Sequence, residues 1–222
     1  MTVRYRYHPY LNALLSHPGV DVNIQDENGL AALHFAVRND DVDSTQALLS
    51  HRNINVNIKD SFGCTPLHYA AKTFNSDCLD LLLAHNDIDV NIKNLFGFTA
   101  LHLAALKRFK YNLHSLLEHK DIDINVRGGN GDTVLHLIIA FGDVGYLQAI
   151  LSYPNIDVNI KNYSGYTPLH IAVRKYFIRC VEVLLCCKNI NVNLRDHNGY
   201  TPLAYANFQE MVTLLVQNGA VK

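Results

Sequence analysis

The feature that most constrains this chain is an internal repeat with a period of 34 residues. The pair Leu-His occurs five times in phase, and a sixth copy of the register reads Leu-Ala. Every copy also carries a glycine four residues before that leucine, at Gly29, Gly63, Gly97, Gly131, Gly165 and Gly199. Because a repeated segment of this length is one supersecondary element that buries its apolar side only against its neighbours, the period predicts a solenoid.

Each copy contains the residues of a tip, a helix, a turn and a second helix. A glycine such as Gly63 takes the positive φ of a tight turn at little cost. Thr65 and Pro66 then supply an N-cap hydroxyl and a residue suited to the first helical position. In most copies an alanine lets neighbouring helices approach closely, and a later Leu-Leu pair forms the buried stripe of a second helix. We therefore predict stacked helix-turn-helix units.

The recurring motif is Asp-x-x-Gly-x-Thr-Pro-Leu-His-x-Ala, which is most complete over residues 60–70. It resembles the ankyrin repeat and covers about residues 14 to 222. The resemblance implies an all-α ankyrin-repeat solenoid of stacked helix-turn-helix units with hairpin-like tips. We expect a single domain over residues 1–222, and its parts are an N-terminal partial or capping unit 1–25, the repeats 26–59, 60–93, 94–127, 128–161 and 162–195, and a shortened C-terminal capping repeat 196–222.

Three places depart from the family pattern. Residues 11–16 match only a second helix, so the N-terminal part either caps the stack or is cut from a longer array. Most repeats carry one extra residue after the second helix, and only the last keeps the usual shorter ending. In the fourth full repeat, Gly128 replaces the usual Asp or Asn and Ile138 replaces the small alanine. We predict a local weak point there, because one loose interface of a solenoid can open without the rest.

The chain contains twelve histidines and five cysteines, so we considered a catalytic or metal-binding site. The chain has no Cys-x-x-Cys or His-x-x-x-His pair, no phosphate-binding loop and no Gly-x-Ser-x-Gly motif. The resemblance implies that the Leu-His histidines are structural hydrogen-bonding residues near the start of the first helix. A second set, His17, His51, His85 and His119, ends the second helices, where a protonated ring is favoured by the helix dipole. We therefore expect no enzyme, no cofactor and no metal site.

The totals limit the remaining classes of function. A net charge of -1 and a pI of about 6.9 provide no field that attracts nucleic acid, so we do not expect nucleic acid as a partner. No segment has the length and apolarity of a membrane span or of a secretory signal. The cysteines fit reduced thiols that serve mostly as small buried hydrophobes. We expect a cytoplasmic monomer, with the nucleus or the cytosol of a host cell as alternative locations.

The resemblance implies that the chain is a protein-binding scaffold whose partner meets the concave face, formed by the tips and the first helices. The residues beside each tip glycine are rich in aromatic rings, and we expect seven apolar residues of this kind to face solvent, with packing against the next tip as the alternative. The predicted partner-binding set is Lys59, Ser61, Phe62, Cys64, Lys93, Leu95, Phe96, Phe98, Lys107, Lys161, Tyr163, Tyr166 and Tyr200.

Two further hypotheses remain open at this point. One base precedes each tip, and this basic row, Lys59, Lys93, Arg127, Lys161 and Arg195, could bind nucleic acid or another anionic ligand, although a base is ordinary at this position in the family. As another alternative, the chain is an effector or adaptor module of a larger assembly. Asparaginyl hydroxylases modify many ankyrin proteins, so the resemblance also makes the asparagines of the Asp-Val-Asn motif candidates for hydroxylation, namely Asn23, Asn91 and Asn159.

Overall fold

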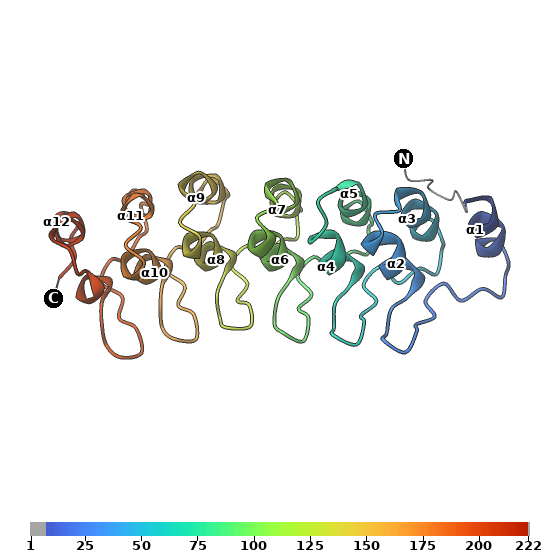
Figure 1. The fold of residues 1–222 in the computed structure, drawn as a ribbon, viewed down its shortest axis with the longest axis horizontal. Helices are drawn as coiled ribbons and strands as arrows, with labels where there is room; N and C mark the ends of the chain where they lie inside the picture. Colours follow the sequence, from blue (N-terminus) through green and yellow to red (C-terminus); the bar gives the residue numbers. More distant parts are fainter. Residues whose placement is uncertain (1–7, 222) are drawn as a thin grey trace. The chain divides into compact units, whose positions relative to one another are not determined.

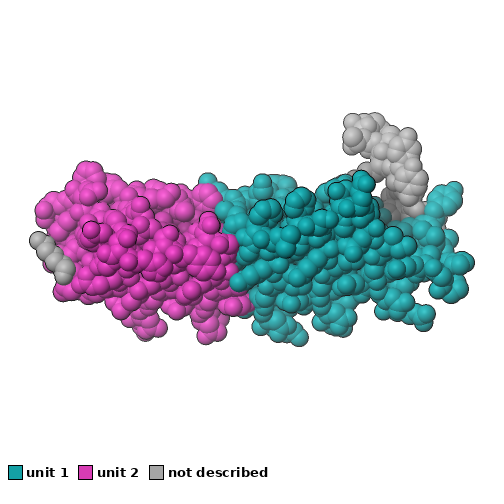
Figure 2. Space-filling view, turned by 90° about the horizontal axis from the view of Figure 1, so that it is seen from below, with its two compact units in different colours: residues 1–122 teal, residues 123–222 magenta. Residues whose placement is uncertain are grey.

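Pairs of antiparallel helices joined by long loops make up the computed structural model, which describes residues 8–221 (Figure 1). These residues contain no β-strand, and one isolated bridge joins Gln25 to Ala31. The all-α solenoid architecture expected from the repeat is therefore confirmed. The chain divides into two compact units, residues 1–122 and residues 123–222, which we call unit 1 and unit 2 (Figure 2).

Among its described residues, unit 1 contains helix α1 and three helix pairs. Helix α1 (His8–Leu15) packs beside the second helix α3. The first helices α2, α4 and α6 pack in one row, and the second helices α1, α3, α5 and α7 pack in another. Their bounds are Ala32–Arg38 (α2), Val42–Leu49 (α3), Pro66–Ala70 (α4), Asp77–Leu83 (α5), Ala100–Lys107 (α6) and Lys110–Leu117 (α7).

Unit 2 repeats the arrangement with three pairs. The first helices α8 and α10 are followed by η1, a single turn of 3₁₀-helix where the sequence had indicated a further α-helix. Proline at the start of η1 is present as in other repeats, but the turn ends at Tyr205, before a second α-helical turn forms. The bounds are Val134–Ala140 (α8), Val144–Leu151 (α9), Pro168–Arg174 (α10), Ile178–Leu185 (α11), Pro202–Tyr205 (η1) and Gln209–Gln217 (α12).

The Thr and His of the motif define the start of the first helices α4, α6, α8 and α10. In α4, Nδ1 of His68 accepts the Thr65 backbone N–H at 3.0 Å and lies 2.9 Å from the Thr65 hydroxyl. The ring then reaches the next tip, because Nε2 of His68 lies 2.9 Å from the carbonyl oxygen of Phe98. An acceptor at Nδ1 and a donor at Nε2 require the neutral ring. The Leu-His histidine is thus a structural link between repeats, as expected.

The tips stack closely in each unit, and this requires glycine. The backbone N–H of Leu95 donates to the carbonyl of Phe62 at 2.9 Å, which joins two tips of unit 1. Gly63 has a φ of 71°, and a Cβ there would lie 3.0 Å from the nitrogen of Leu95. In unit 2 a Cβ on Gly131 would lie 2.5 Å from the nitrogen of Tyr163. A side chain at either position would therefore push neighbouring tips apart.

The core lies between the two helix rows of each unit. Leu67, Leu79 and Leu101 are buried in unit 1, and Leu135, Ile138 and Leu169 are buried in unit 2. Burial of large aliphatic side chains supplies most of the stability of such a stack. Three of the five cysteines, Cys64, Cys78 and Cys180, are buried and none forms a disulfide among the described residues.

Candidate functional surface

The tips of unit 1 expose three large apolar side chains next to one another. Phe62, Leu95 and Phe96 are 57%, 75% and 60% exposed. The Phe62 and Phe96 rings stack with their centroids 6.4 Å apart and an angle of 20° between planes. The sequence placed all three in the partner-binding set. Their exposure makes a contiguous apolar patch on the described surface, which we call the phenylalanine tip patch.

Two other aromatic residues of the predicted set turn partly inward. Phe98 and Tyr166 are half-buried, and each ring lies 5.9 Å from the histidine that begins the following helix, His102 and His170. Each ring therefore packs on a histidine of its own repeat and keeps part of its surface exposed.

Cys64 requires a correction. The sequence placed it in the partner-binding set because it follows the tip glycine, but the side chain is only 7% exposed. Its backbone N–H donates to Oδ1 of Asp60, and Nδ2 of Asn94 lies 3.5 Å from its sulfur. Burial raises the pKa of the Cys64 thiol, so it is a neutral core group.

The tips of unit 2 expose two tyrosines, at other positions beside the tip glycine than Phe62 and Phe96 of unit 1. Tyr163 and Tyr200 are 62% and 53% exposed. Behind them the ring of Tyr205 meets the rings of Tyr166 and Tyr200 edge to face, with centroids 6.0 Å and 5.9 Å away. This tyrosine cluster consists of Tyr166, Tyr200 and Tyr205. It combines apolar ring surface with hydroxyl groups that bind water or a polar partner.

One tyrosine in each unit is fastened to the aspartate that begins a tip. In unit 1 the Tyr69 hydroxyl donates to Oδ2 of Asp60 at 2.6 Å, and in unit 2 the Tyr205 hydroxyl donates to Oδ2 of Asp196. Burial and the neighbouring carboxylate raise the pKa of Tyr69. Burial alone would raise the pKa of Asp196, but the Tyr205 hydroxyl and two backbone N–H groups outweigh it and lower that pKa. Both tyrosines therefore stay protonated donors at neutral pH.

The polar residues of the predicted set lie mostly at the surface. Ser61, Lys59, Lys93 and Lys107 are exposed, and Lys161 is half-buried. Of the other bases in the row, Arg127 is exposed, and Arg195 is exposed and donates from Nη1 to the Gly199 carbonyl at 2.7 Å. Among residues 8–221, no three His, Cys, Asp or Glu side chains are grouped so that they could hold a metal ion. Within residues 8–221 no helix has the length and apolarity needed to cross a bilayer.

Four buried histidines have lowered pKa values. Burial is the main cause that lowers the pKa of His34, His68, His136 and His170 below 6.5, although a carbonyl acceptor at Nε2 partly opposes it. These rings are neutral at pH 7 and act in structure rather than in proton transfer.

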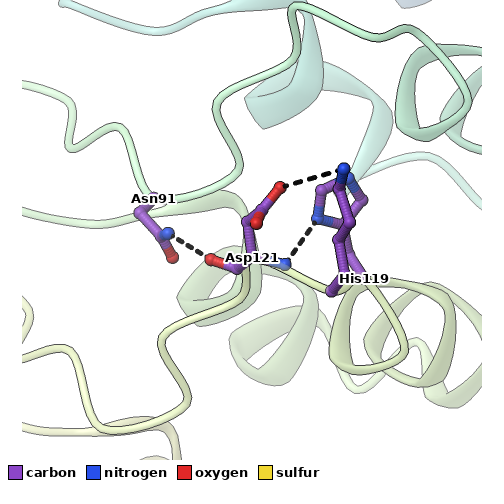
Figure 3. A network of polar contacts seen from close by, with 4 residues as sticks. Asn91, His119 and Asp121 are labelled. Carbon is purple, nitrogen blue, oxygen red and sulfur yellow. Dashed lines mark hydrogen bonds and ion pairs between the residues drawn. The ribbon is translucent and has the colours of Figure 1, made fainter.

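The second set of histidines accepts hydrogen bonds at the ends of second helices. Nδ1 of His119 accepts the Asp121 N–H at 3.3 Å (Figure 3), and His51 and His85 accept the N–H two residues later in the same way. In these residues Nδ1 is therefore placed to accept a backbone N–H just beyond the second helix. His17 makes the same contact with Gly19 at 3.2 Å.

The candidate asparagines for hydroxylation connect successive repeats. Nδ2 of Asn91 donates to the carbonyl of Asp121 at 2.7 Å (Figure 3). Asn23 and Asn159 donate in the same way, to the carbonyls of Asn53 and Asn189, at 2.7 Å each. All three side chains are half-buried. Their hydroxylation stays a prediction, and it would require a hydroxylase to reach side chains that are engaged in the stack.

Sequence reasoning missed a second exposed aromatic group, at the turns between first and second helices. Phe74 is 92% exposed, and its ring meets that of Phe109 edge to face at 6.1 Å. In unit 2 the rings of Tyr176 and Phe208 lie 4.4 Å apart. Tyr176 has a φ of 57°, a backbone region that favours glycine and costs other residues about 1 kcal/mol or more. An aromatic residue at this turn position is the sequence feature that could have indicated the second aromatic group.

Comparisons with known proteins agree with this geometry. A family model described as ankyrin repeats (3 copies) matches residues 1–94, 86–162 and 147–222. No curated protein matches the sequence. The ankyrin repeat domain of Bcl-3, a member of the IkappaB protein family, is a similar solved structure, with a TM-score of 0.85, 24% identity, and coverage of 94% of this chain and 91% of that chain.

Two other solved structures are also similar. An ankyrin repeat domain from Acinetobacter baumannii AYE has a TM-score of 0.75 at 26% identity, and the match covers 85% of this chain and 98% of that chain. The ankyrin repeat protein EF0377 has a TM-score of 0.74 at 22% identity, with coverage of 90% of this chain and 97% of that one. These likenesses are to the fold.

Proposed function

This chain belongs to the ankyrin repeat family, whose domains mediate protein–protein interaction, and we propose that it is a non-enzymatic scaffold that binds a partner protein through its tips and first helices. The observation that carries this proposal is the phenylalanine tip patch, where Phe62, Leu95 and Phe96 are all more than half exposed. Exposed apolar patches with a polar rim commonly mark protein-binding surfaces.

The geometry of the patch supports binding rather than internal packing. Phe62 and Phe96 already stack on each other, yet each keeps more than half of its surface in water. Burial of the rest against a partner would be favourable by about 25 cal/mol for each Å² of apolar surface removed from water. The backbone beneath is held by the Leu95 to Phe62 hydrogen bond, so little order is lost on binding.

The surrounding charges define the rim. Lys59 and Lys93 are exposed and precede the two tips, and Ser61 is exposed beside Phe62. Aromatic rings at the centre with polar groups at the edge are the usual anatomy of a protein interface. In this proposal the chain acts as a cytoplasmic monomer, a setting in which the buried thiols stay reduced.

Affinity capture with quantitative mass spectrometry tests this proposal. The bait is the full chain from cells of its own source, compared with Phe62→Ala/Phe96→Ala and with the matched control Phe74→Ala/Tyr111→Ala. The control removes two exposed aromatic rings from the turn side and the outer helix. We expect specific partners of the wild type to be depleted about tenfold or more by the tip variant and retained by the control.

Two outcomes would contradict the proposal. If partners are retained equally by the tip variant, the proposed face is wrong. If the captured material is nucleic acid whose retention falls steeply with ionic strength, the basic row is the binding surface instead. Helical melts of both variants in parallel show whether each is folded.

A further inference from the structure

Arg174, the last residue of α10, lies in a corner between two tyrosine rings of unit 2. Its guanidinium carbon is 4.4 Å from the Tyr166 ring centroid and 5.2 Å from that of Tyr205. The two rings are nearly perpendicular to each other, at 81°. Tyr205 is itself fixed, because its hydroxyl donates to Asp196. The two rings therefore confine the guanidinium, whose N–H groups make no hydrogen bond that the structure shows for residues 8–221.

No acidic partner within the described residues uses those N–H groups. The carboxylate at the base of the cluster, Asp196, is occupied, since Oδ2 accepts the Tyr205 hydroxyl and Oδ1 accepts the N–H groups of Asn198 and Tyr200. Arg174 takes part in none of the ion pairs that the structure shows for residues 8–221. On the outer helix, by contrast, Arg179 is paired with Glu182 at 2.8 Å.

The charges near Arg174 are mixed. Besides the burial that dominates, the charge of Asp196 raises the pKa of His170, whereas the charges of Lys161 and Arg174 lower it. Asp196 is already engaged by Tyr205 and by two backbone N–H groups, so it is not a partner for Arg174. Arg195 is exposed beside the last tip. A restrained guanidinium with free donors matches a carboxylate in charge and shape, because its fork can make two parallel hydrogen bonds. A phosphate dianion would need a second free cation of comparable order, and Arg195 is engaged with Gly199.

We propose that Arg174, positioned by Tyr166 and Tyr205, is a docking site for one Asp or Glu side chain of the partner protein. Exposed Tyr200 lies against Tyr205 and offers apolar ring surface beside the acid-binding site. The partner segment therefore carries an acidic residue next to an apolar one. This inference rests on the proposed function and specifies the chemistry of the partner.

Selection from a random twelve-residue phage-displayed peptide library tests the proposal with the full chain as target. The wild type is compared with Arg174→Gln and with Arg38→Gln. Arg38 is the matched control, since it occupies the same repeat position in unit 1, is exposed, and lies over a single ring, Phe35, at 4.9 Å. We expect peptides with Asp or Glu at a fixed position to be enriched on the wild type and on Arg38→Gln, and not on Arg174→Gln.

A synthetic peptide from the selection then gives the decisive measurement. We expect Arg174→Gln to weaken binding about tenfold or more, as loss of a charged hydrogen-bonded pair does. Changing the peptide's acidic residue to its amide should weaken binding equally, with no further loss when both changes are combined. Tyr166→Leu, which keeps Arg174 but removes one supporting ring, should cause a smaller loss.

Other outcomes overturn the inference. Peptides that bind without an acidic residue, or that bind Arg174→Gln equally well, show that Arg174 is not an acid-docking site, while protein binding by the tips survives. Preference for a phosphoserine peptide over its glutamate counterpart would assign the site to phosphate. A selection that yields no binder to the wild type counts against this inference and against the proposed function together.

Discussion

The two units expose different chemistry beside their tip glycines. In unit 1 the tips display Phe62, Leu95 and Phe96, which have no hydrogen-bonding group in their side chains. In unit 2 the tips display Tyr163 and Tyr200, and Arg174 lies beside Tyr205. The backbone of the tips is the same, with a glycine at positive φ in each. The comparison teaches that the repeat preserves a scaffold while the residues beside the tip glycine vary the surface that it presents.

We expect the buried cores of the two units to be alike, in contrast to their exposed tips. Core substitutions test this expectation and should have the largest effect on stability. Leu101 in unit 1 and Leu169 in unit 2 are both fully buried. We expect Leu101→Ala and Leu169→Ala each to reduce the free energy of unfolding by about 2–5 kcal/mol, because each leaves a cavity in a packed core. Urea unfolding followed by circular dichroism measures both. A loss under about 1 kcal/mol in one unit would show that its core is not packed as described.

The buried histidines should also act alike in the two units. His68 and His170 each accept a backbone N–H and donate to the next tip, so both must be neutral in the folded chain. Their pKa values are lowered on folding, hence the unfolded chain binds more protons below pH 6.5. Stability is then complete above about pH 6.5 and decreases as the pH falls below it.

Unfolding measured between pH 5 and 8 checks this expectation. Replacement of His68 by Ala should cost about 1–3 kcal/mol at pH 7.5, since it leaves the Thr65 N–H and the Phe98 carbonyl without this partner. The variant should also show a shallower decrease in stability at acid pH than the wild type. An unchanged slope would mean that His68 is not a proton-linked group.

The two units should differ in local stability. Residues 127–145 contain Gly128 and also Ile138, which is larger than the alanine at this position in most repeats. They lie just after the division between the two units. We predict that their amide hydrogens exchange faster than those of residues 65–83 in unit 1. Hydrogen exchange read by mass spectrometry gives the answer directly. Equal protection of the two segments would remove the proposed weak point.

The smallest effects on stability should come from the residues that differ most between the units. Phe62→Ala/Phe96→Ala and Arg174→Gln change exposed side chains, so each should alter the free energy of unfolding by about 0.5 kcal/mol or less per substitution. The same urea measurement checks this. A larger loss of stability would mean that these side chains pack within the fold. The two units would then differ in how their tips pack and not only in the surface that they expose.

The sequence allowed the repeat, its helices and its buried histidines to be predicted, but it did not separate the exposed tip residues from the buried ones. Cys64 and Phe62 flank the same glycine and both donate their N–H groups to Oδ1 of Asp60, yet Cys64 is buried and Phe62 is exposed. The aromatic rings at Phe74 and Tyr176 lie outside the tips that the resemblance singled out. Arg174 was missed for a different reason, since its two rings come from separate repeats.

Every copy of the repeat carries the same pattern, so the sequence by itself determined the stacked helix-turn-helix architecture. The resemblance to the family implied the structural role of the Leu-His ring, and the hydrogen bonds of the structure showed that the ring is neutral. Contacts between copies depend on which side chains meet across a repeat boundary, and these residues lie far apart in the chain, for example 30 positions for His68 and Phe98. Only the tertiary structure decided that Phe62 stacks on Phe96 and that Arg174 lies between Tyr166 and Tyr205. The physical reason is that burial and ring contact are set by neighbours in space, which the period brings together but does not identify.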